Sequence, residues 1–151
     1  MGRNRMQIYE QSSPQLQSQE SMMDWAGRLD SFLKGSGLYL RCQQVRPIST
    51  DNTALLPYYE ILLGIDSEAG EEVSPVHFVP AVESLQRSHE LDIWVMRNVF
   101  EWISANPSGF ASLGGFAINL SANSLSNPEV MSYLQQVLPG SDIPTHKIAF
   151  E

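Results

Sequence analysis

The order of apolar and amphipathic segments predicts an α/β fold built on parallel strands. From about residue 59 onward, short apolar runs typical of buried strands alternate with stretches whose apolar residues recur at helical spacing. The resulting order is strand, helices, strand, helix, strand. Because such alternation places helices outside a parallel sheet, we expect an α/β sheet or barrel. The 151 residues and their 42% hydrophobic content suffice for the core of one domain.

The beginning of the chain divides into a polar segment and a helix. Residues 10–21 are rich in Gln and Ser and nearly free of apolar anchors, which is typical of a linker. From Asp24 onward apolar residues recur at helical spacing, until a Gly-Ser-Gly sequence at residues 35–37 ends the pattern. We therefore expect a linker over residues 10–23, followed by a short amphipathic helix that leads into the folded domain.

Two strands are expected next, at Leu38–Val45 and Tyr58–Ile65, and their turn-rich connection suits a hairpin. The acidic stretch at residues 66–72 lacks the ligand spacing of a calcium loop after Gly70, so we expect a solvated loop. The remaining elements are placed by apolar periodicity, by an Asn127-Pro128 cap and by Pro and Gly at the breaks. They are helices at residues 78–85, 91–103 and 128–138 and strands at residues 116–120 and 148–150.

Composition excludes several classes of function. The formal charge of −8 and the sequence pI of 4.7 argue against a groove for duplex nucleic acid, which needs clustered Lys and Arg. A small phosphate ligand held through metal ions remains compatible with this charge. No run approaches the ~18 apolar residues of a membrane span, so we expect a cytoplasmic segment without membrane contact. The single cysteine, Cys42, excludes an internal disulfide and is expected to be a small packed side chain.

Three oxygen-bearing side chains lie in or at the end of apolar runs that are typical of strands: Glu60, Asn119 and Glu151. A carboxylate or amide that is buried without partners costs several kcal/mol. Three of them delivered from strands therefore predict a shared ligand, most simply a divalent cation. For Glu60, a buried carboxylate paired with a neighbouring arginine is the alternative interpretation.

Six short segments together resemble the EAL domain of bacterial cyclic di-GMP phosphodiesterases, in the order of that family. The run Tyr-Glu-Ile-Leu-Leu-Gly at residues 59–64 is similar to the signature Glu-Ala-Leu-Leu-Arg and places Glu60 at its first glutamate. Residues 40–45 resemble the first strand of the family, which ends in Gln-Pro-Ile, and residues 74–83 resemble Pro-x-x-Phe-Ile-Pro-x-Ala-Glu. Residues 91–95 resemble Ile-Asp-x-Trp-Val, residues 118–121 resemble Asn-Leu-Ser, and residues 150–151 resemble the start of Glu-x-Thr-Glu. Six segments in register make a chance match very improbable.

The resemblance implies a domain organisation. Residues 2–5 and the strand-like segment after them resemble the final strand of a GGDEF domain, the diguanylate cyclase module that often precedes EAL. We therefore expect residues 1–9 to end a GGDEF-like domain and residues 24–151 to form the N-terminal part of an EAL domain. The fold expected for this part is an incomplete TIM-type (β/α) barrel, truncated after about the fourth strand. A homodimer formed through EAL domains is compatible with the family.

The resemblance also implies a site and a reaction. Active sites on such barrels lie at the carboxyl ends of the strands. There the family binds two Mg²⁺ or Mn²⁺ ions and hydrolyses cyclic di-GMP to linear pGpG. Carried over by position, Glu60 would be a catalytic metal ligand, Asn119 and Glu151 further ligands, and Gln43 and Leu62 substrate-binding residues. Two other residues, Glu83 and Asp92, would support the site through hydrogen bonds, although each also suits a charge at a helix end.

Two departures separate the chain from a complete enzyme of this family. Where the signature has Arg, this sequence has Gly64, which supplies no cation for a phosphate. The remaining ligands of the family, an Asp-Asp pair, a Lys and a Glu, lie beyond Glu151, so the chain alone is expected to be inactive. A degenerate EAL domain that binds cyclic di-GMP or a partner protein without hydrolysis is the first alternative. An unrelated α/β domain with structural carboxylates is the second.

Overall fold

The computed structural model describes residues 14–35, 37–48, 55–66, 70, 72 and 75–151. Its helices are α1 (Pro14–Leu33), α2 (Pro75–Ser84), α3 (Ser88–Ala105), α4 (Pro107–Ala111) and α5 (Pro128–Val137). Its strands are β1 (Leu38–Val45), β2 (Tyr58–Ile65), β3 (Gly115–Ile118) and β4 (Ile148–Phe150). The predicted end of a GGDEF-like domain at residues 1–9, the turn at 49–53 and most of the acidic loop lie outside the described residues.

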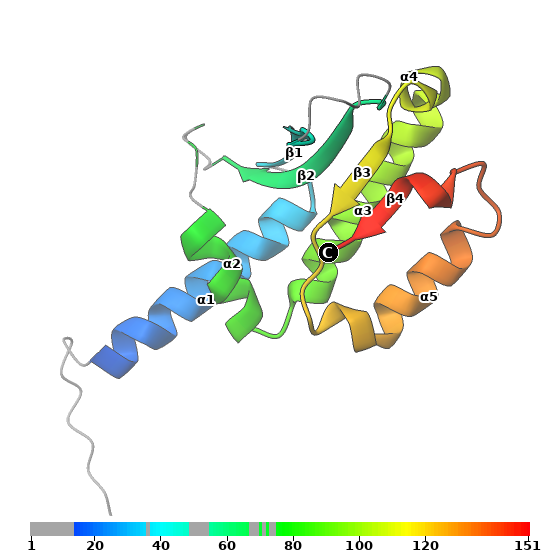
Figure 1. Cartoon of the computed structure of the whole chain (residues 1–151). Coiled ribbons are helices and arrows are strands. Elements are labelled where there is room, and N and C mark those ends of the chain that lie inside the picture. The colour runs from blue at the N-terminus through cyan, green and yellow to red at the C-terminus, as the bar shows by residue number, and fades with distance from the viewer. Residues whose placement is uncertain (1–13, 36, 49–54, 67–69, 71, 73–74) are drawn as a thin grey trace, which may run out of the picture.

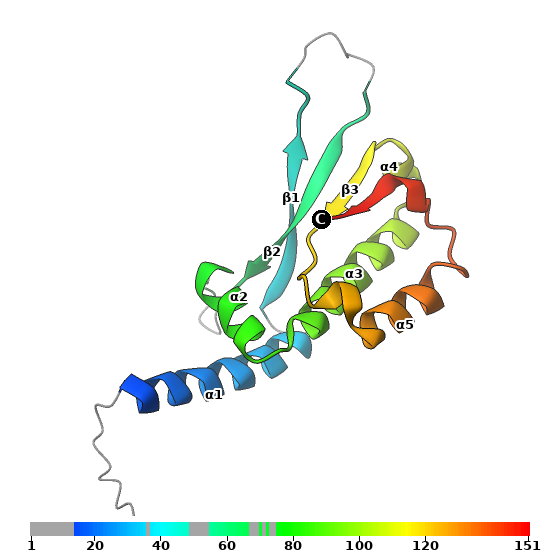
Figure 2. The same ribbon diagram turned by 60° about the horizontal axis from the view of Figure 1, so that its bottom comes forward.

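The four strands form one sheet in the order β1-β2-β3-β4 (Figure 1). The strands β1 and β2 pair antiparallel, which confirms the predicted hairpin, and β2, β3 and β4 are parallel. Parallel neighbours need crossovers, and these are supplied by α2 to α4 and by α5. Figure 2 shows β1 and β2 crossing the molecule as a long hairpin, beside which β3 and β4 are short. The predicted mixed α/β fold is confirmed.

The first helix begins at Pro14, ten residues earlier than the sequence pattern predicted. The predicted start of this helix at Asp24 is therefore wrong, because the backbone of residues 14–23, within the expected linker, is already helical. The segment lacks apolar anchors, but Gln, Glu and Met favour helices and Pro favours the first turn. In Figures 1 and 2 the N-terminal end of α1 extends away from the sheet.

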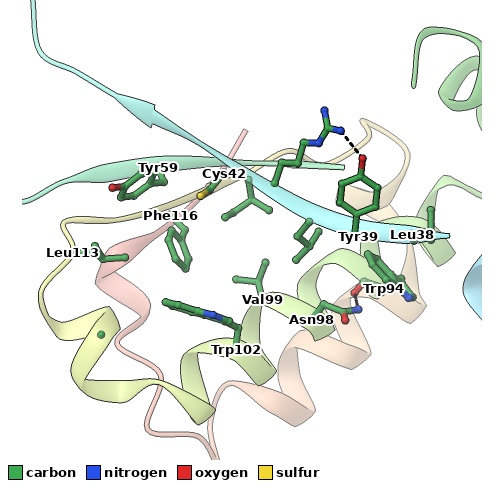
Figure 3. A pocket seen from close by; sticks show the side chains of 14 residues that line it. Leu38, Tyr39, Cys42, Tyr59, Trp94, Asn98, Val99, Trp102, Leu113 and Phe116 are labelled. Carbon is green, nitrogen blue, oxygen red and sulfur yellow. Dashed lines mark hydrogen bonds between the residues drawn. The ribbon is translucent and has the colours of Figure 1, made fainter. Parts of the chain in front are cut away.

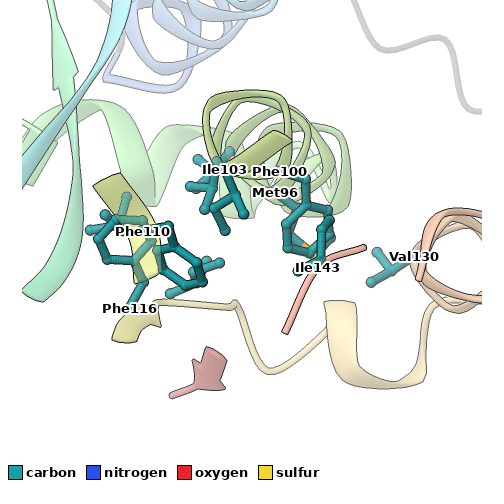
Figure 4. Packing of buried hydrophobic residues seen from close by; sticks show 11 residues of the cluster. Met96, Phe100, Ile103, Phe110, Phe116, Val130 and Ile143 are labelled. Atoms are coloured by element: carbon teal, nitrogen blue, oxygen red, sulfur yellow. The ribbon is translucent and has the colours of Figure 1, made fainter. Parts of the chain in front are cut away.

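The main core lies between α3 and one face of the sheet (Figure 4). Met96, Phe100 and Ile103 of α3 are almost completely buried there, beside Phe116 of β3. The Trp102 ring packs against the Phe116 ring, with 5.6 Å between the ring centroids. The tryptophans of α3 therefore pack against the sheet, as their helical spacing predicted.

A second core holds α1 and α2 against the end of the hairpin. The Phe78 ring of α2 is buried between Trp25 and Phe32 of α1, in edge contacts with centroid distances of 5.7 and 5.5 Å. Ile65 at the end of β2 is fully buried in the same cluster. No helix in the described part of the chain is long and apolar enough to span a membrane.

Local sequence signals account for the ends of several elements. The side chain of Asn127 accepts a hydrogen bond from the backbone N–H of Glu129 at 2.8 Å, and Pro128 occupies the first turn of α5, so the predicted cap is confirmed. The break expected after α3 occurs, but a short new helix, α4, begins directly at Pro107. The third strand ends at Ile118 and not at residue 120. Asn119 therefore follows the strand.

Candidate functional site at the carboxyl edge of the sheet

The strand register places three predicted site residues on one face of the sheet. In β2, Ile61 faces α3 and belongs to the main core. Because side chains alternate along a strand, Glu60 and Leu62 project to the opposite face. Gln43 of β1 is the direct antiparallel partner of Glu60 and so projects to that face as well. We call this side of the sheet the Glu60 face.

Glu60 and Asn119 are in direct contact across 59 residues of sequence. The Asn119 amide Nδ2 donates a hydrogen bond to Glu60 Oε1 at 2.7 Å. Glu60 pairs in register with Ala117 of β3, two residues before Asn119, so both side chains reach the same edge of the sheet. The predicted convergence of these two oxygen-bearing side chains is observed.

Glu151 lies beside Asn119 through the backbone. Its N–H donates to the carbonyl of Ile118 at 3.0 Å, and its carbonyl accepts from the N–H of Leu120 at 2.8 Å. These two bonds place residue 151 directly opposite residue 119 in the parallel ladder. Burial raises the pKa of Tyr58, and the negative charge of Glu151 raises it further. The three predicted ligands therefore lie on neighbouring strands, Glu60 within β2 and Asn119 and Glu151 directly after β3 and β4.

Asp92 fixes the loop that carries Asn119. Asp92 is only 9% exposed, and its carboxylate Oδ2 accepts three hydrogen bonds, from Ser121 N at 2.9 Å, Ser121 Oγ at 2.8 Å and Ser124 Oγ at 2.6 Å. A side chain that merely ended α3 would be solvated. Asp92 instead ties the start of α3 to the segment directly after Asn119.

The two serines of this network were not predicted as functional residues. Ser121 belongs to the Asn-Leu-Ser segment, so its hydroxyl next to a predicted ligand was an available signal. Ser124 is fully buried, and no local pattern marks its contact with a carboxylate 32 residues earlier.

A small cavity joins several of the predicted residues. It has a volume of about 250 Å³ and lies between the end of β2, α2 and the first turns of α3. Leu62, Glu83, Asp92 and Asn119 all line it, and Glu83 itself is exposed. The structure thus brings the two residues predicted to support the site to the same place as one predicted ligand and one predicted substrate contact.

A larger cavity lies on the other face of the hairpin and carries none of the predicted site residues (Figure 3). Its volume is about 710 Å³, and its walls are mainly apolar side chains of β1, β2 and α3. Figure 3 shows Tyr39 and Trp94 projecting to opposite sides of β1. Cys42 borders this cavity and is exposed, so the expectation of a packed thiol is wrong.

Gly64, where the family signature has Arg, is covered by a neighbouring side chain. A Cβ at residue 64 would lie 2.3 Å from Cε2 and 2.4 Å from Cζ of the Tyr39 ring. Tyr39 is the direct antiparallel partner of Gly64, so its ring lies over the Glu60 face at this rung. The place of the missing side chain is therefore occupied by Tyr39.

The donor set suits a hard divalent cation in part. Carboxylate and amide oxygens are ligands that Mg²⁺ and Mn²⁺ favour. Glu60 and Glu151 offer carboxylates, and Asn119 offers an amide oxygen. Nowhere in the described ranges do three His, Cys, Asp or Glu side chains gather closely enough to hold a metal ion. Two carboxylates and one amide would therefore need further ligands to complete a metal site. Because the amide nitrogen of Asn119 donates to Glu60, the carbonyl oxygen of the same side chain is the atom that would coordinate the ion.

Comparison with known proteins shows the family of this chain. A family model of the EAL domain matches residues 37–151, from just before β1 to the end of the chain. The chain is 29% identical, over 99% of its residues, to the cyclic di-GMP phosphodiesterase PdeB of Shewanella oneidensis. It is 27% identical, over 91% of its residues, to the cyclic di-GMP phosphodiesterase PdeF of Escherichia coli. It spans 17% of the length of each of these relatives.

Solved structures share the fold. The FimX EAL domain of Pseudomonas aeruginosa bound to c-di-GMP superposes with a TM-score of 0.70 at 24% identity, over 84% of this chain and 49% of that one. The FimX EAL domain of Xanthomonas citri, in complex with c-di-GMP, gives a TM-score of 0.69 at 20% identity, over 88% and 50%. The chain thus matches about half of each of these solved chains. With the family model over residues 37–151, it belongs to the EAL domain family.

Proposed function

We propose that this chain supplies half of the active site of an EAL domain that binds cyclic di-GMP and, in the complete protein, hydrolyses it to linear pGpG. The observation that carries the proposal is that Glu60, Asn119 and Glu151 lie on neighbouring strands, with Asn119 bonded to Glu60 and directly beside Glu151. Residues 1–9, as the end of a GGDEF-like domain, and α1, as the connection to the EAL domain, remain part of the proposal.

Each of the predicted site residues has a defined task in this reaction. Glu60, Asn119 and Glu151 would hold divalent metal ions together with ligands from the rest of the domain. When bound, a pair of Mg²⁺ or Mn²⁺ ions supplies an activated water and neutralises charge on the phosphodiester. Asn119 orients the Glu60 carboxylate by its hydrogen bond, and the Asp92 network holds Asn119 in place. Gln43 and Leu62 border the same face and would contact the dinucleotide.

The negative charge of the chain favours phosphate binding through metal ions. With a formal charge of −8, it has few cations with which to hold two phosphates directly. Carboxylates that bind metal ions, which in turn bind phosphate, reconcile an acidic protein with an anionic substrate. Hydrolysis would then depend strictly on divalent metal.

A degenerate EAL domain, which binds the dinucleotide without cleaving it, is the second candidate function. The Tyr39 ring over Gly64 is the observation that favours it, because an arginine at this position would require that ring to move. Loss of this cation weakens the hold on the phosphate undergoing attack. Intact Glu60, Asn119 and Glu151 favour hydrolysis instead.

One experiment separates the two candidates. The full-length protein is incubated with cyclic di-GMP and Mg²⁺, Mn²⁺ or EDTA, and linear pGpG is measured by ion-exchange chromatography. Calorimetric titration with the same nucleotide measures binding. We expect pGpG with either metal and none with EDTA. Binding without pGpG under any condition would favour the degenerate domain, and neither heat nor product would contradict both proposals.

A further inference from the structure

A cation from β1 lies on the Glu60 face, beside the proposed dinucleotide site. Arg41 is the direct antiparallel partner of Leu62, one residue pair of the same face away from the rung of Gln43 and Glu60. Two residues of strand correspond to about 7 Å, which a guanidinium on its flexible stem easily spans. Arg41 is therefore within reach of a ligand held at Glu60.

Three contacts fix the guanidinium of Arg41. Its Nη2 donates to the hydroxyl of Tyr39, and its Cζ lies 5.1 Å from the centroid of the Tyr39 ring. Its Nη1 lies 2.9 Å from a carboxylate oxygen of Glu72. Glu72 itself is placed beside the end of β2 by an isolated antiparallel bridge with Asp66. The side chains of Arg41 and Glu72 are 48% and 56% exposed, so the ion pair is accessible to a ligand.

The same Tyr39 ring excludes any side chain at residue 64. The space above Gly64 that a Cβ would need is filled by ring atoms at 2.3 to 2.8 Å. Tyr39 thus fills the space into which the arginine of the family signature would project. Its hydroxyl also accepts a hydrogen bond from Arg41, which lies one residue pair farther along the same face. The Tyr39 side chain therefore both occupies the place of the signature arginine and positions the guanidinium of Arg41.

We propose that Arg41, positioned by Tyr39, is the arginine that contacts a phosphate of cyclic di-GMP in this protein, in place of the signature arginine absent at Gly64. The inference rests on the proposed function for its ligand. The planar guanidinium offers forked donors that match phosphate oxygens. Glu72 is a competing anion that must release Nη1 when the dinucleotide binds. An exposed ion pair of this kind is weak and easily exchanged.

A purely structural role for Arg41 makes a different prediction about Glu72. If the ion pair only held the loop beside the hairpin, Glu72→Gln would leave nucleotide affinity unchanged or lower it. If Glu72 competes with phosphate for Arg41, Glu72→Gln raises affinity. This readout separates ligand contact from scaffold.

The test measures binding to the full-length protein by calorimetry in Mg²⁺, with a non-hydrolysable phosphorothioate analogue of cyclic di-GMP that prevents turnover. We expect Arg41→Ala to weaken binding at least tenfold, Tyr39→Phe to weaken it severalfold, and Glu72→Gln to strengthen it severalfold. Arg46→Ala is the matched control, because it removes one exposed cation just beyond the end of β1. That variant should bind within twofold of the wild type. Melting temperatures verify that each variant is folded.

A rescue variant sharpens the result. Tyr39→Ala with Gly64→Arg clears the ring and restores an arginine at the signature position, so it should recover binding in the Arg41→Ala background. Wild-type binding that Arg41→Ala leaves intact would overturn the inference alone. If Arg41→Ala does not fold, unchanged affinity of Glu72→Gln would overturn it. Absence of wild-type binding would overturn the inference together with the proposed function.

Discussion

The two faces of the sheet are built by the same strands but differ in what they require of each residue. Toward α3, Ile61 and Ile118 are buried in a continuous apolar core, where volume and hydrophobicity decide the contribution. On the other face, Gln43, Glu60 and Asn119 present polar groups whose value depends on register, because a hydrogen bond of 2.7 Å tolerates little displacement. The first face should therefore govern stability and the second ligand chemistry.

The largest expected effect lies on the Glu60 face. Replacing Glu60 by Gln removes a charged metal ligand with almost no change in volume. We expect hydrolysis of cyclic di-GMP by the full-length protein to fall by about 10³-fold, equivalent to about 4 kcal/mol of transition-state stabilisation. Chromatographic assay of pGpG measures the rate, and the melting temperature should stay within about 2 °C of the wild type. A large loss of stability with retained turnover would reverse the roles of the two faces.

The matched change on the core face is Ile118→Ala. Ile118 is fully buried, so truncation leaves a cavity and should lower the free energy of unfolding by about 2–5 kcal/mol. Leu62→Ala serves as the control, because Leu62 is a half-buried residue of the opposite face and should cost less than half as much. Urea unfolding measures both variants. Equal losses would show that the two faces do not differ in their contribution to stability.

Asp92 connects the two regions, because it lies in α3 and accepts hydrogen bonds from the loop that follows Asn119. Asp92→Asn replaces a charged acceptor of three hydrogen bonds by a neutral amide. We expect a loss of about 1–3 kcal/mol in the free energy of unfolding, because charge-assisted bonds to a buried acceptor weaken. Divalent metal affinity of the full-length protein should also fall, which calorimetry measures. Unchanged metal affinity would limit Asp92 to a structural role.

The smallest effect concerns an ion pair away from both faces. Hydrogen bonding from Arg87 lowers the pKa of Glu90, although partial burial opposes this. Since the folded pKa is below the unfolded one, the pair stabilises above the unfolded pKa of about 4.3, and this contribution is lost as pH falls through the folded value. Glu90→Gln should therefore lower the melting temperature slightly at pH 7 and leave it unchanged near pH 2. A difference of the same size at both pH values would contradict this linkage.

Much of the strand order followed from local patterns. The hairpin of β1 and β2, the parallel strands after it and the Asn127 cap all correspond to features of adjacent residues. The length of α1 did not follow, because residues 14–23 carry helix-forming residues without the apolar stripe that marks a packed helix. Composition typical of a linker and propensity for a helix coincide there, so the pattern placed the start of the helix ten residues too late.

By itself, the sequence determined which oxygen-bearing residues lie in or directly after strands and in what order, since period-two alternation and apolar runs are local features of neighbouring residues. Only the tertiary structure decided which of them meet. Register between strands set the contact of Glu60 with Asn119, and folding of the loop set the contacts of Asp92 with two serines. The contact of Tyr39 with Gly64 is of the same kind. Such pairs are distant in sequence, and their distances depend on the packing of the whole domain.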